Sequence, residues 1–173
     1  MPIDRIYLLG MPGSGKSTLA KQLAKEIDFH FIDLDELITL HERHTINEIF
    51  AIYGEEYFRQ IEQKILLQTT TFTRTVIALG GGTPCFFDNM EVIKESGFSI
   101  YLDVPLDIIA KRLSKESNTR PLLNTKPEDL LTQITEKYNQ RIDFYKQAHL
   151  TISGANLSVK DLLLWLSYMG KTS

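Results

Sequence analysis

Residues 10–18 read GMPGSGKST, and the rest of the chain is organised around them. A short apolar run at residues 5–9 precedes it and is typical of a buried parallel strand. The segment that follows, residues 19–27, carries leucine or isoleucine at every fourth position, which is typical of one side of a helix. The pattern G-x-x-x-x-G-K-[ST] between a strand and a helix is a P-loop, so the sequence predicts a nucleoside triphosphate site.

The residue types of this loop suit phosphate binding. Glycines allow backbone conformations that are closed to other residues, so that successive N–H groups can turn towards an anion. The following helix directs the positive end of its dipole at the same point. Lys16 can then reach the outer phosphates, and the Ser17 hydroxyl can ligate Mg²⁺, which is the cofactor we expect. The predicted triphosphate-binding residues of the loop are Gly13, Ser14, Gly15, Lys16, Ser17 and Thr18.

Length and composition restrict the class of protein. The chain has 173 residues, which suits a single domain at residues 1–173 with a core of its own. Its net charge of −3 argues against a broad basic surface for nucleic acid. The one cysteine, Cys85, cannot form an internal disulfide, and no apolar run approaches the ~18 residues of a membrane helix. We therefore expect a cytoplasmic protein that binds neither nucleic acid nor membranes, with a monomer as the default for this size.

Strand and helix patterns alternate along the chain, which predicts an α/β fold of three layers with a parallel sheet between helices. The expected strands cover residues 5–9, 29–32, 76–79, 99–102 and 150–152. The expected helices cover residues 19–27, 36–43, 45–53, 55–68, 88–95, 105–113, 127–147 and 159–169. Gly54 separates two of these helices, and the polar residues 114–126 are expected to form a loop. Ligands of such sheets bind at the carboxyl ends of the strands.

Two aspartates, Asp33 and Asp35, follow the second expected strand. If the extended geometry continues, both side chains point to the same side. One could then face Mg²⁺ bound by Ser17, and the other could take a proton or a hydrogen bond from an acceptor hydroxyl. Alternatively, one of them only caps the next helix, a role that fits Asp35 equally well. Beside a P-loop, the pair as a whole favours the functional interpretation.

Arg59 lies three residues before Glu62 on an expected helix. This spacing fits either a surface ion pair that contributes little, or an arginine that Glu62 orients towards a substrate carboxylate. Arg141 lies on the same helical stripe as Ile134, Tyr138 and Tyr145, where an unpaired charge is costly. It could be an arginine packed on its own methylenes, but the position favours an anion site.

The polar loop and the triple glycine complete the set of candidates. Loops as long as residues 114–126 are often lids that exclude water from phosphates, and Arg120 could stabilise transition-state charge there. Arg112, in the helix before the lid, is expected to flank the nucleotide. Gly80, Gly81 and Gly82 end a strand, so we expect a close backbone approach and an N–H donated to the substrate. Cys85 is expected to be a small buried residue and not a nucleophile.

Six motifs, in this order and spacing, resemble the shikimate kinase family. They are Gly13-Ser14-Gly15-Lys16-Ser17-Thr18, Asp33-x-Asp35, Phe58-Arg59-x-x-Glu62, Gly80-Gly81-Gly82, Arg120-Pro121-Leu122-Leu123 and Arg141. The resemblance extends over most of the chain, and while each motif is widespread, the set is specific.

The resemblance implies a nucleoside-monophosphate-kinase-like P-loop fold with sheet order 2-3-1-4-5, substrate-binding helices at about residues 34–69 and a lid at about residues 112–126. It implies that Asp35, Arg59, Arg141 and the Gly81 region bind shikimate, with the two arginines on its carboxylate. It also implies that Asp33 helps to hold Mg²⁺ and that Arg120 closes on ATP. Lys16, Asp35 and Arg120 are thus the expected catalytic residues.

Two departures and two alternatives accompany this interpretation. The family often has a glycine where this chain has Arg43, so we expect a different bend there, and residues 153–156 do not match an adenine-contacting loop. Another small-molecule P-loop kinase, such as a gluconate kinase, would share the fold but would not need the Asp33-x-Asp35, Arg59 and Arg141 combination. A non-catalytic nucleotide-dependent regulator would need no acceptor site.

Overall fold

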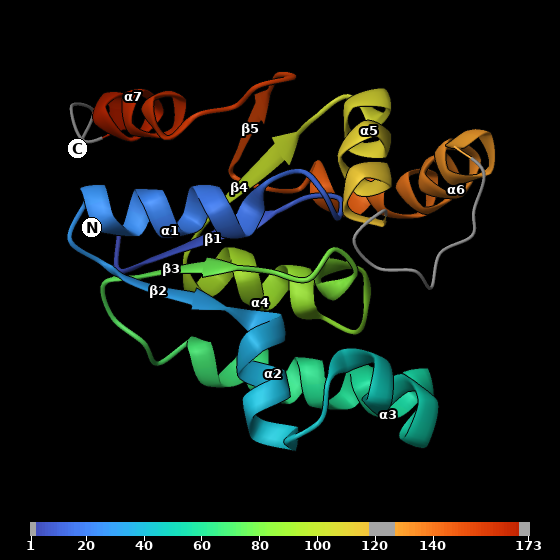
Figure 1. Cartoon of the computed structure of the whole chain (residues 1–173). Helices are drawn as coiled ribbons and strands as arrows, with labels where there is room; N and C mark the ends of the chain where they lie inside the picture. Colours follow the sequence, from blue (N-terminus) through green and yellow to red (C-terminus); the bar gives the residue numbers. More distant parts are fainter. Residues whose placement is uncertain (1–2, 118–126, 170–173) are drawn as a thin grey trace.

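The computed structural model describes residues 3–117 and 127–169 (Figure 1). Its centre is a five-stranded parallel sheet in the order β2-β3-β1-β4-β5, which confirms the expected topology. The strands are β1 (Arg5–Leu9), β2 (His30–Asp33), β3 (Thr75–Ala78), β4 (Phe98–Asp103) and β5 (Leu150–Ser153). The helices are α1 (Lys16–Glu26), α2 (Leu34–Glu42), α3 (Ile46–Thr69), α4 (Asn89–Ser96), α5 (Leu106–Ser117), α6 (Pro127–Tyr145) and α7 (Val159–Met169).

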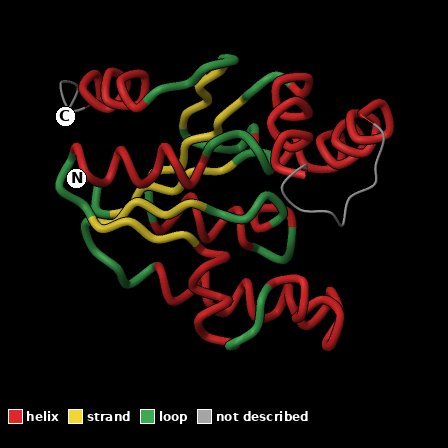
Figure 2. The backbone as a smooth tube through the Cα atoms, in the orientation of Figure 1, coloured by secondary structure: helices red, strands yellow, loops and turns green. Residues whose placement is uncertain are grey.

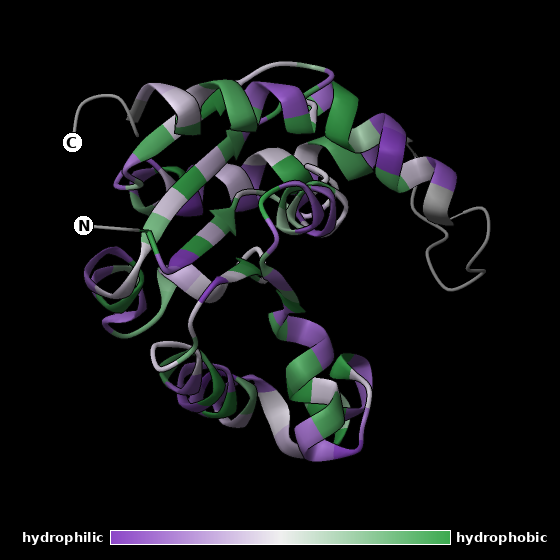
Figure 3. Cartoon of the chain, turned by 90° about the vertical axis from the view of Figure 1, so that its left-hand side faces the viewer, coloured by the Kyte–Doolittle hydropathy of each residue, from purple (hydrophilic) through white to green (hydrophobic). Residues whose placement is uncertain are grey.

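The central strands are apolar on both sides because helices cover both faces of the sheet. In β1, Ile6 and Leu8 point into a core shared with α1 and α7, whereas Tyr7 and Leu9 point into a core shared with α2 to α6. Alternate residues of one strand therefore belong to different layers. The helices carry apolar and polar bands side by side, as amphipathic helices do (Figure 3).

Most expected helices are confirmed, with differences at their ends. Gly54 interrupts α3 with a φ of 83°, at the predicted break. The prediction that a loop begins at residue 114 was wrong, because α5 continues to Ser117. Residues 114–117 contain neither glycine nor proline, the residues that most often end a helix. The remainder of the predicted lid lies outside the described residues. A 3₁₀ turn, η1 (Thr83–Cys85), follows the triple glycine and was not predicted.

Arg43, the departure from the family pattern, caps the carboxyl end of α2. It adopts a φ of 58° and a ψ of 28°, the left-handed conformation that glycine takes without strain. The arginine thus occupies the left-handed conformation that ends α2 and leads into α3.

The fold places the loops after β1, β2 and β3 at one edge of the sheet. Figure 2 shows this edge between the α2–α3 pair and the α5–α6 pair. Because ligands of such sheets bind at the carboxyl ends of the strands, this edge is where the site is expected.

Within the described part of the chain, no helix is long and apolar enough to span a membrane.

Candidate active site

The P-loop requires its glycines. Gly10, Gly13 and Gly15 have φ values of 145°, 80° and 92°, which side chains rarely tolerate. A Cβ on Gly10 would also lie 2.8 Å from the carbonyl oxygen of Leu102. The loop borders a cleft of about 660 Å³, whose other walls include the ends of β2 and β3 and the residues that follow β5.

Lys16 is buried at the base of this cleft. Its Nζ donates hydrogen bonds to the carbonyl oxygens of Gly10 (2.9 Å) and Met11 (2.8 Å). Burial lowers the pKa of Lys16 to about 8, although the negative charges of Asp35 and Asp33 oppose this effect. An ammonium with so little hydration interacts strongly with a phosphate that enters the cleft.

Asp33 uses its two oxygens for different contacts. Oδ2 accepts a hydrogen bond from the Ser17 hydroxyl (2.5 Å), and Oδ1 accepts one from the backbone N–H of Asp35 (3.0 Å) as the amino-terminal cap of α2. The cap of α2 is therefore Asp33, whereas for Asp35 the sequence alone left capping and a functional role equally favoured. A hydroxyl and a carboxylate oxygen side by side are the hard donors that Mg²⁺ prefers, so these two residues fit that ion.

Asp35 lies in the first turn of α2, so the extended geometry expected from the sequence ends at Asp33. It still reaches the cleft, and its Oδ1 lies 2.9 Å from the position that a Cβ on Gly80 would take. Burial raises the pKa of Asp35 to about 6, and the nearby carboxylates of Asp33 and Glu62 add to the rise. A carboxylate with such a pKa is suited to accept a proton near neutral pH.

Arg59 is fixed by acidic and aromatic neighbours. Its Nη1 donates to Glu62 Oε2 (2.7 Å), and its Nη2 donates to Glu55 Oε1 (3.2 Å). The guanidinium lies 3.9 Å from the ring centre of Phe86 and 5.0 Å from that of Phe58. Glu62 is only 1% exposed, so the interpretation as a surface ion pair of little consequence is wrong.

Arg141 lies on α6, on the stripe that the sequence predicted, between the buried residues Ile134 and Tyr145. Among the described residues, no carboxylate forms an ion pair with Arg141. Burial raises the pKa of Cys85 and of Tyr145, and the nearby positive charge of Arg141 opposes this rise at both residues. Arg141 is therefore a half-buried cation whose guanidinium lies beside Gly81, a residue of the cleft wall.

The triple glycine brings these side chains together, because each glycine faces a different one. A Cβ on Gly81 would lie 3.1 Å from Arg141 Nη1, and a Cβ on Gly82 would lie 2.9 Å from Arg59 Nη1. With Asp35 against Gly80, one carboxylate and two guanidiniums follow one another along three residues. The close backbone approach that the sequence predicted is present at all three positions.

Two arginines and the cysteine remain from the predicted set. Arg112 Nη1 donates to the Gly13 carbonyl oxygen (3.2 Å) and its Nη2 donates to that of Ala155 (2.9 Å), so it joins the P-loop to the segment after β5. Arg120 lies outside the described residues. Burial raises the pKa of Cys85 to about 11, which agrees with the prediction that it is not a nucleophile.

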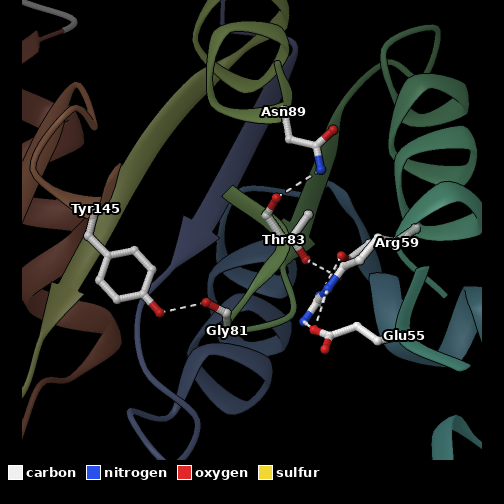
Figure 4. Close-up of polar contacts among 7 residues, drawn as sticks. Glu55, Arg59, Gly81, Thr83, Asn89 and Tyr145 are labelled. Carbon is white, nitrogen blue, oxygen red and sulfur yellow. Dashed lines mark hydrogen bonds and ion pairs between the residues drawn. The ribbon is translucent and has the colours of Figure 1, made fainter. Parts of the chain in front are cut away.

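Sequence reasoning missed two residues that hold the glycine segment (Figure 4). Tyr145 is fully buried, and its hydroxyl donates to the Gly81 carbonyl oxygen (2.5 Å). Thr83 is also fully buried, and its hydroxyl donates to Glu62 Oε1 (2.6 Å). The only sequence signal for Thr83 was its place directly after the glycines. The helical stripe of Tyr145 predicted a core residue and no contact with the glycines.

Comparisons with known proteins agree with this geometry. The family model described as shikimate kinase matches residues 12–164. A shikimate kinase of Clostridium botulinum (strain ATCC 19397 / Type A) is 43% identical over 155 residues, which are 89% of either chain. The crystal structure of shikimate kinase from Bacteroides thetaiotaomicron has a TM-score of 0.88 at 34% identity and covers 96% of this chain and 99% of its own. Shikimate kinase from Acinetobacter baumannii, in complex with shikimate, has a TM-score of 0.86 at 31% identity and covers 99% of this chain and 96% of its own.

Proposed function

Because the chain belongs to the shikimate kinase family, we propose that it transfers the terminal phosphoryl group of ATP to the 3-hydroxyl of shikimate. The products are shikimate 3-phosphate and ADP, in the biosynthesis of chorismate and the aromatic amino acids. The observation that carries the proposal is the row of Asp35, Arg141 and Arg59 along Gly80–Gly82, next to a P-loop. Such a row suits an acceptor with a hydroxyl at one end and a carboxylate at the other.

The acceptor's carboxylate is bound by Arg59 and Arg141. A guanidinium presents a planar fork of N–H donors that matches the two oxygens of a carboxylate. Arg59 reaches the site from α3 and Arg141 from α6, so the carboxylate lies between two separate elements. Backbone N–H groups of Gly80, Gly81 and Gly82 complete the acceptor side.

The acceptor's hydroxyl lies at Asp35. The carboxylate orients this hydroxyl and takes its proton as the new O–P bond forms and the bond to the ADP oxygen breaks. Its raised pKa, due first to burial, matches this task near neutral pH.

The transferred group is surrounded by positive charge. Lys16, with the N–H groups of Gly13 to Thr18, stabilises the charge on the phosphoryl oxygens. Ser17 and Asp33 would hold Mg²⁺, which when bound neutralises charge on the β- and γ-phosphates. Arg112 flanks the nucleotide through its position beside Gly13 and Ala155. Arg120, in the predicted lid, would add further positive charge at the transferred group.

Further parts of the proposal concern the state of the protein. We propose a monomeric cytoplasmic enzyme of one domain, in which residues 34–69 carry the acceptor site. The single cysteine of the chain and its net charge of −3 support a reducing compartment and small-molecule partners.

The experiment that tests the proposal is coupled ADP release by the purified protein with ATP and Mg²⁺. Shikimate, gluconate, a mixture of nucleoside monophosphates and no acceptor are compared. ADP release that requires shikimate supports the proposal. Release with gluconate or a nucleotide would contradict the roles of Asp35, Arg59 and Arg141, and no release with any acceptor would favour a regulator.

A further inference from the structure

We propose that Thr83 is a positioning residue that fixes Glu62 and, through Glu62, the guanidinium of Arg59. This inference rests on the proposed function, because it concerns how Arg59 is held ready for the acceptor's carboxylate. Thr83 itself touches neither reacting group; its effect passes through the buried carboxylate beside it.

The first step of the argument is the hydrogen bonding of Glu62. One of its oxygens, Oε2, accepts from Arg59 Nη1 (2.7 Å), and the other, Oε1, accepts from Thr83 Oγ1 (2.6 Å). The side chain is 1% exposed, so water cannot replace either partner. A buried carboxylate is tolerated and held in one orientation only where its oxygens are hydrogen-bonded.

The second step concerns what else could hold Arg59. Glu55 also contacts the guanidinium, at 3.2 Å and 3.4 Å, but its side chain is 60% exposed. An exposed carboxylate contributes little to orientation, since water competes for it. Phe86 packs on the guanidinium plane, but among the hydrogen-bonding partners the direction of the Arg59 fork depends mainly on Glu62.

The third step is that Thr83 is itself held rigidly. Asn89, which is fully buried at the start of α4, donates from Nδ2 to the Thr83 carbonyl oxygen (2.8 Å). The backbone N–H of Thr83 donates to the Gly80 carbonyl oxygen (3.1 Å). Figure 4 shows Asn89 directed at Thr83, with Arg59 beside it. The backbone of Thr83 is thus held at its N–H and at its carbonyl oxygen, which places the hydroxyl against Glu62.

The fourth step is the space around the hydroxyl. A Cβ on Gly80 would lie 2.9 Å from Thr83 Oγ1, 2.9 Å from Asp35 Oδ1 and 3.2 Å from Glu62 Oε1. Two carboxylates thus converge beside Gly80, and Thr83 supplies the donor that keeps Glu62 engaged. Without that donor, Glu62 is free to turn, and Arg59 loses its fixed partner.

The test uses Thr83→Val, which keeps the shape of the side chain and removes the hydroxyl. We expect the KM for shikimate to rise roughly tenfold, as for the loss of one hydrogen bond to a charged group. We expect kcat and the KM for ATP to stay within about twofold of the wild-type values, because Arg59 contributes binding that is the same in the ground and transition states. Thr83→Ser restores the donor, so its KM for shikimate should return to near the wild-type value.

Thr75→Val is the matched control. Thr75 is a buried threonine whose hydroxyl also donates a hydrogen bond, to the Thr73 carbonyl oxygen, but at the amino end of β3. It should leave the KM for shikimate unchanged, whatever it does to thermal unfolding.

The outcomes separate the two proposals. A wild-type protein that requires shikimate, together with a Thr83→Val variant of unchanged KM, would overturn the role of Thr83 alone. Failure of Thr83→Ser to restore the KM would do the same, because it would trace the effect to packing. If Thr83→Val does not fold, Thr83→Ala and Thr83→Ser are compared in its place. A wild-type protein that does not respond to shikimate would overturn the proposed function and this inference with it.

Discussion

The two ends of the sheet both collect polar side chains but use them differently. At the carboxyl end, Lys16 and Asp35 are charged groups whose pKa values burial has shifted towards neutrality, to about 8 and about 6. At the amino end, the polar groups are hydrogen-bonded to one another and to the backbone. Arg5 donates to the carbonyl oxygens of Phe72 and Ser96, and the Tyr7 hydroxyl lies 3.1 Å from both Thr69 Oγ1 and Ser96 Oγ.

The comparison shows that residue type does not decide the role of a polar side chain. Arg5 and Arg141 are both partly buried arginines, yet Arg5 is satisfied by the protein itself, whereas Arg141 lies beside Gly81 of the cleft wall and forms no ion pair with a described carboxylate. Groups satisfied internally stabilise the fold. Groups that remain available are stabilised by a ligand, so substitutions at the two ends should have opposite consequences for activity and stability.

The largest expected effect is that of Lys16→Met at the carboxyl end. We expect kcat to fall by at least about a hundredfold, since one donor to the developing charge is lost. The free energy of unfolding should not fall much, because the cost of burying the ammonium offsets its two hydrogen bonds to the Gly10 and Met11 carbonyl oxygens. Coupled ADP release and thermal unfolding measure the two quantities, with Lys21→Met, on the exposed side of α1, as the control. Equal activity in the Lys16 variant would show that the two ends do not differ in this way.

The second expected effect, at the same end, is that of Arg141→Lys. A lysine keeps the charge but cannot present a planar fork, so the KM for shikimate should rise by about tenfold or more. Stability should change little, since no ion pair with a described carboxylate is lost. Arg74→Lys, which alters a mainly exposed arginine paired with Asp28, is the matched control. An unchanged KM in Arg141→Lys would make Arg141 a packing residue, the alternative that its helical position left open.

The sequence was sufficient for the architecture, because the signals are local. Apolar runs gave the strands, glycines gave the break at Gly54 and the P-loop, and family resemblance gave the sheet order. It also identified Arg59 and Arg141 as charges on or beside buried stripes, although the catalytic and binding roles of the site residues stay predictions. The features that the sequence did not predict depend on where the chain turns or on contacts between segments that are distant along the chain.

Two examples show why these features could not be predicted from the sequence. Whether Asp33 or Asp35 caps α2 depends on where the chain turns out of β2, which both residues permit locally. Thr83 and Glu62 are 21 residues apart, and their hydrogen bond exists only because η1 packs against α3. A buried polar pair of this kind leaves no periodic signal in either segment.

The smallest expected effect belongs to the amino end, where His149→Gln should change how stability depends on pH. His149 Nδ1 accepts from the backbone N–H of Ser99 (3.1 Å) and lies 2.8 Å from its hydroxyl, while the ring stacks on Phe98. Because Nδ1 accepts a backbone hydrogen bond, the folded state favours the neutral ring. Burial lowers the pKa of His149 below its ordinary value of 6.5, and the charge of Lys94 lowers it further.

The sign of the pH effect follows from this lowered pKa. Above pH 6.5 the ring is neutral in both the folded and the unfolded chain, and its contribution to stability is complete. As the pH falls below 6.5, the unfolded chain takes up a proton first, so wild-type stability declines. Because the ring is largely exposed and its interactions are screened by solvent, the unfolding midpoint of wild type should fall only slightly more than that of His149→Gln between pH 7.5 and pH 5.5. His30→Gln, which removes an exposed histidine at the start of β2, should retain the wild-type pH dependence. The kcat and KM values of the His149 variant at pH 7.5 should equal those of wild type, and a change in either would show that the amino end also contributes to activity.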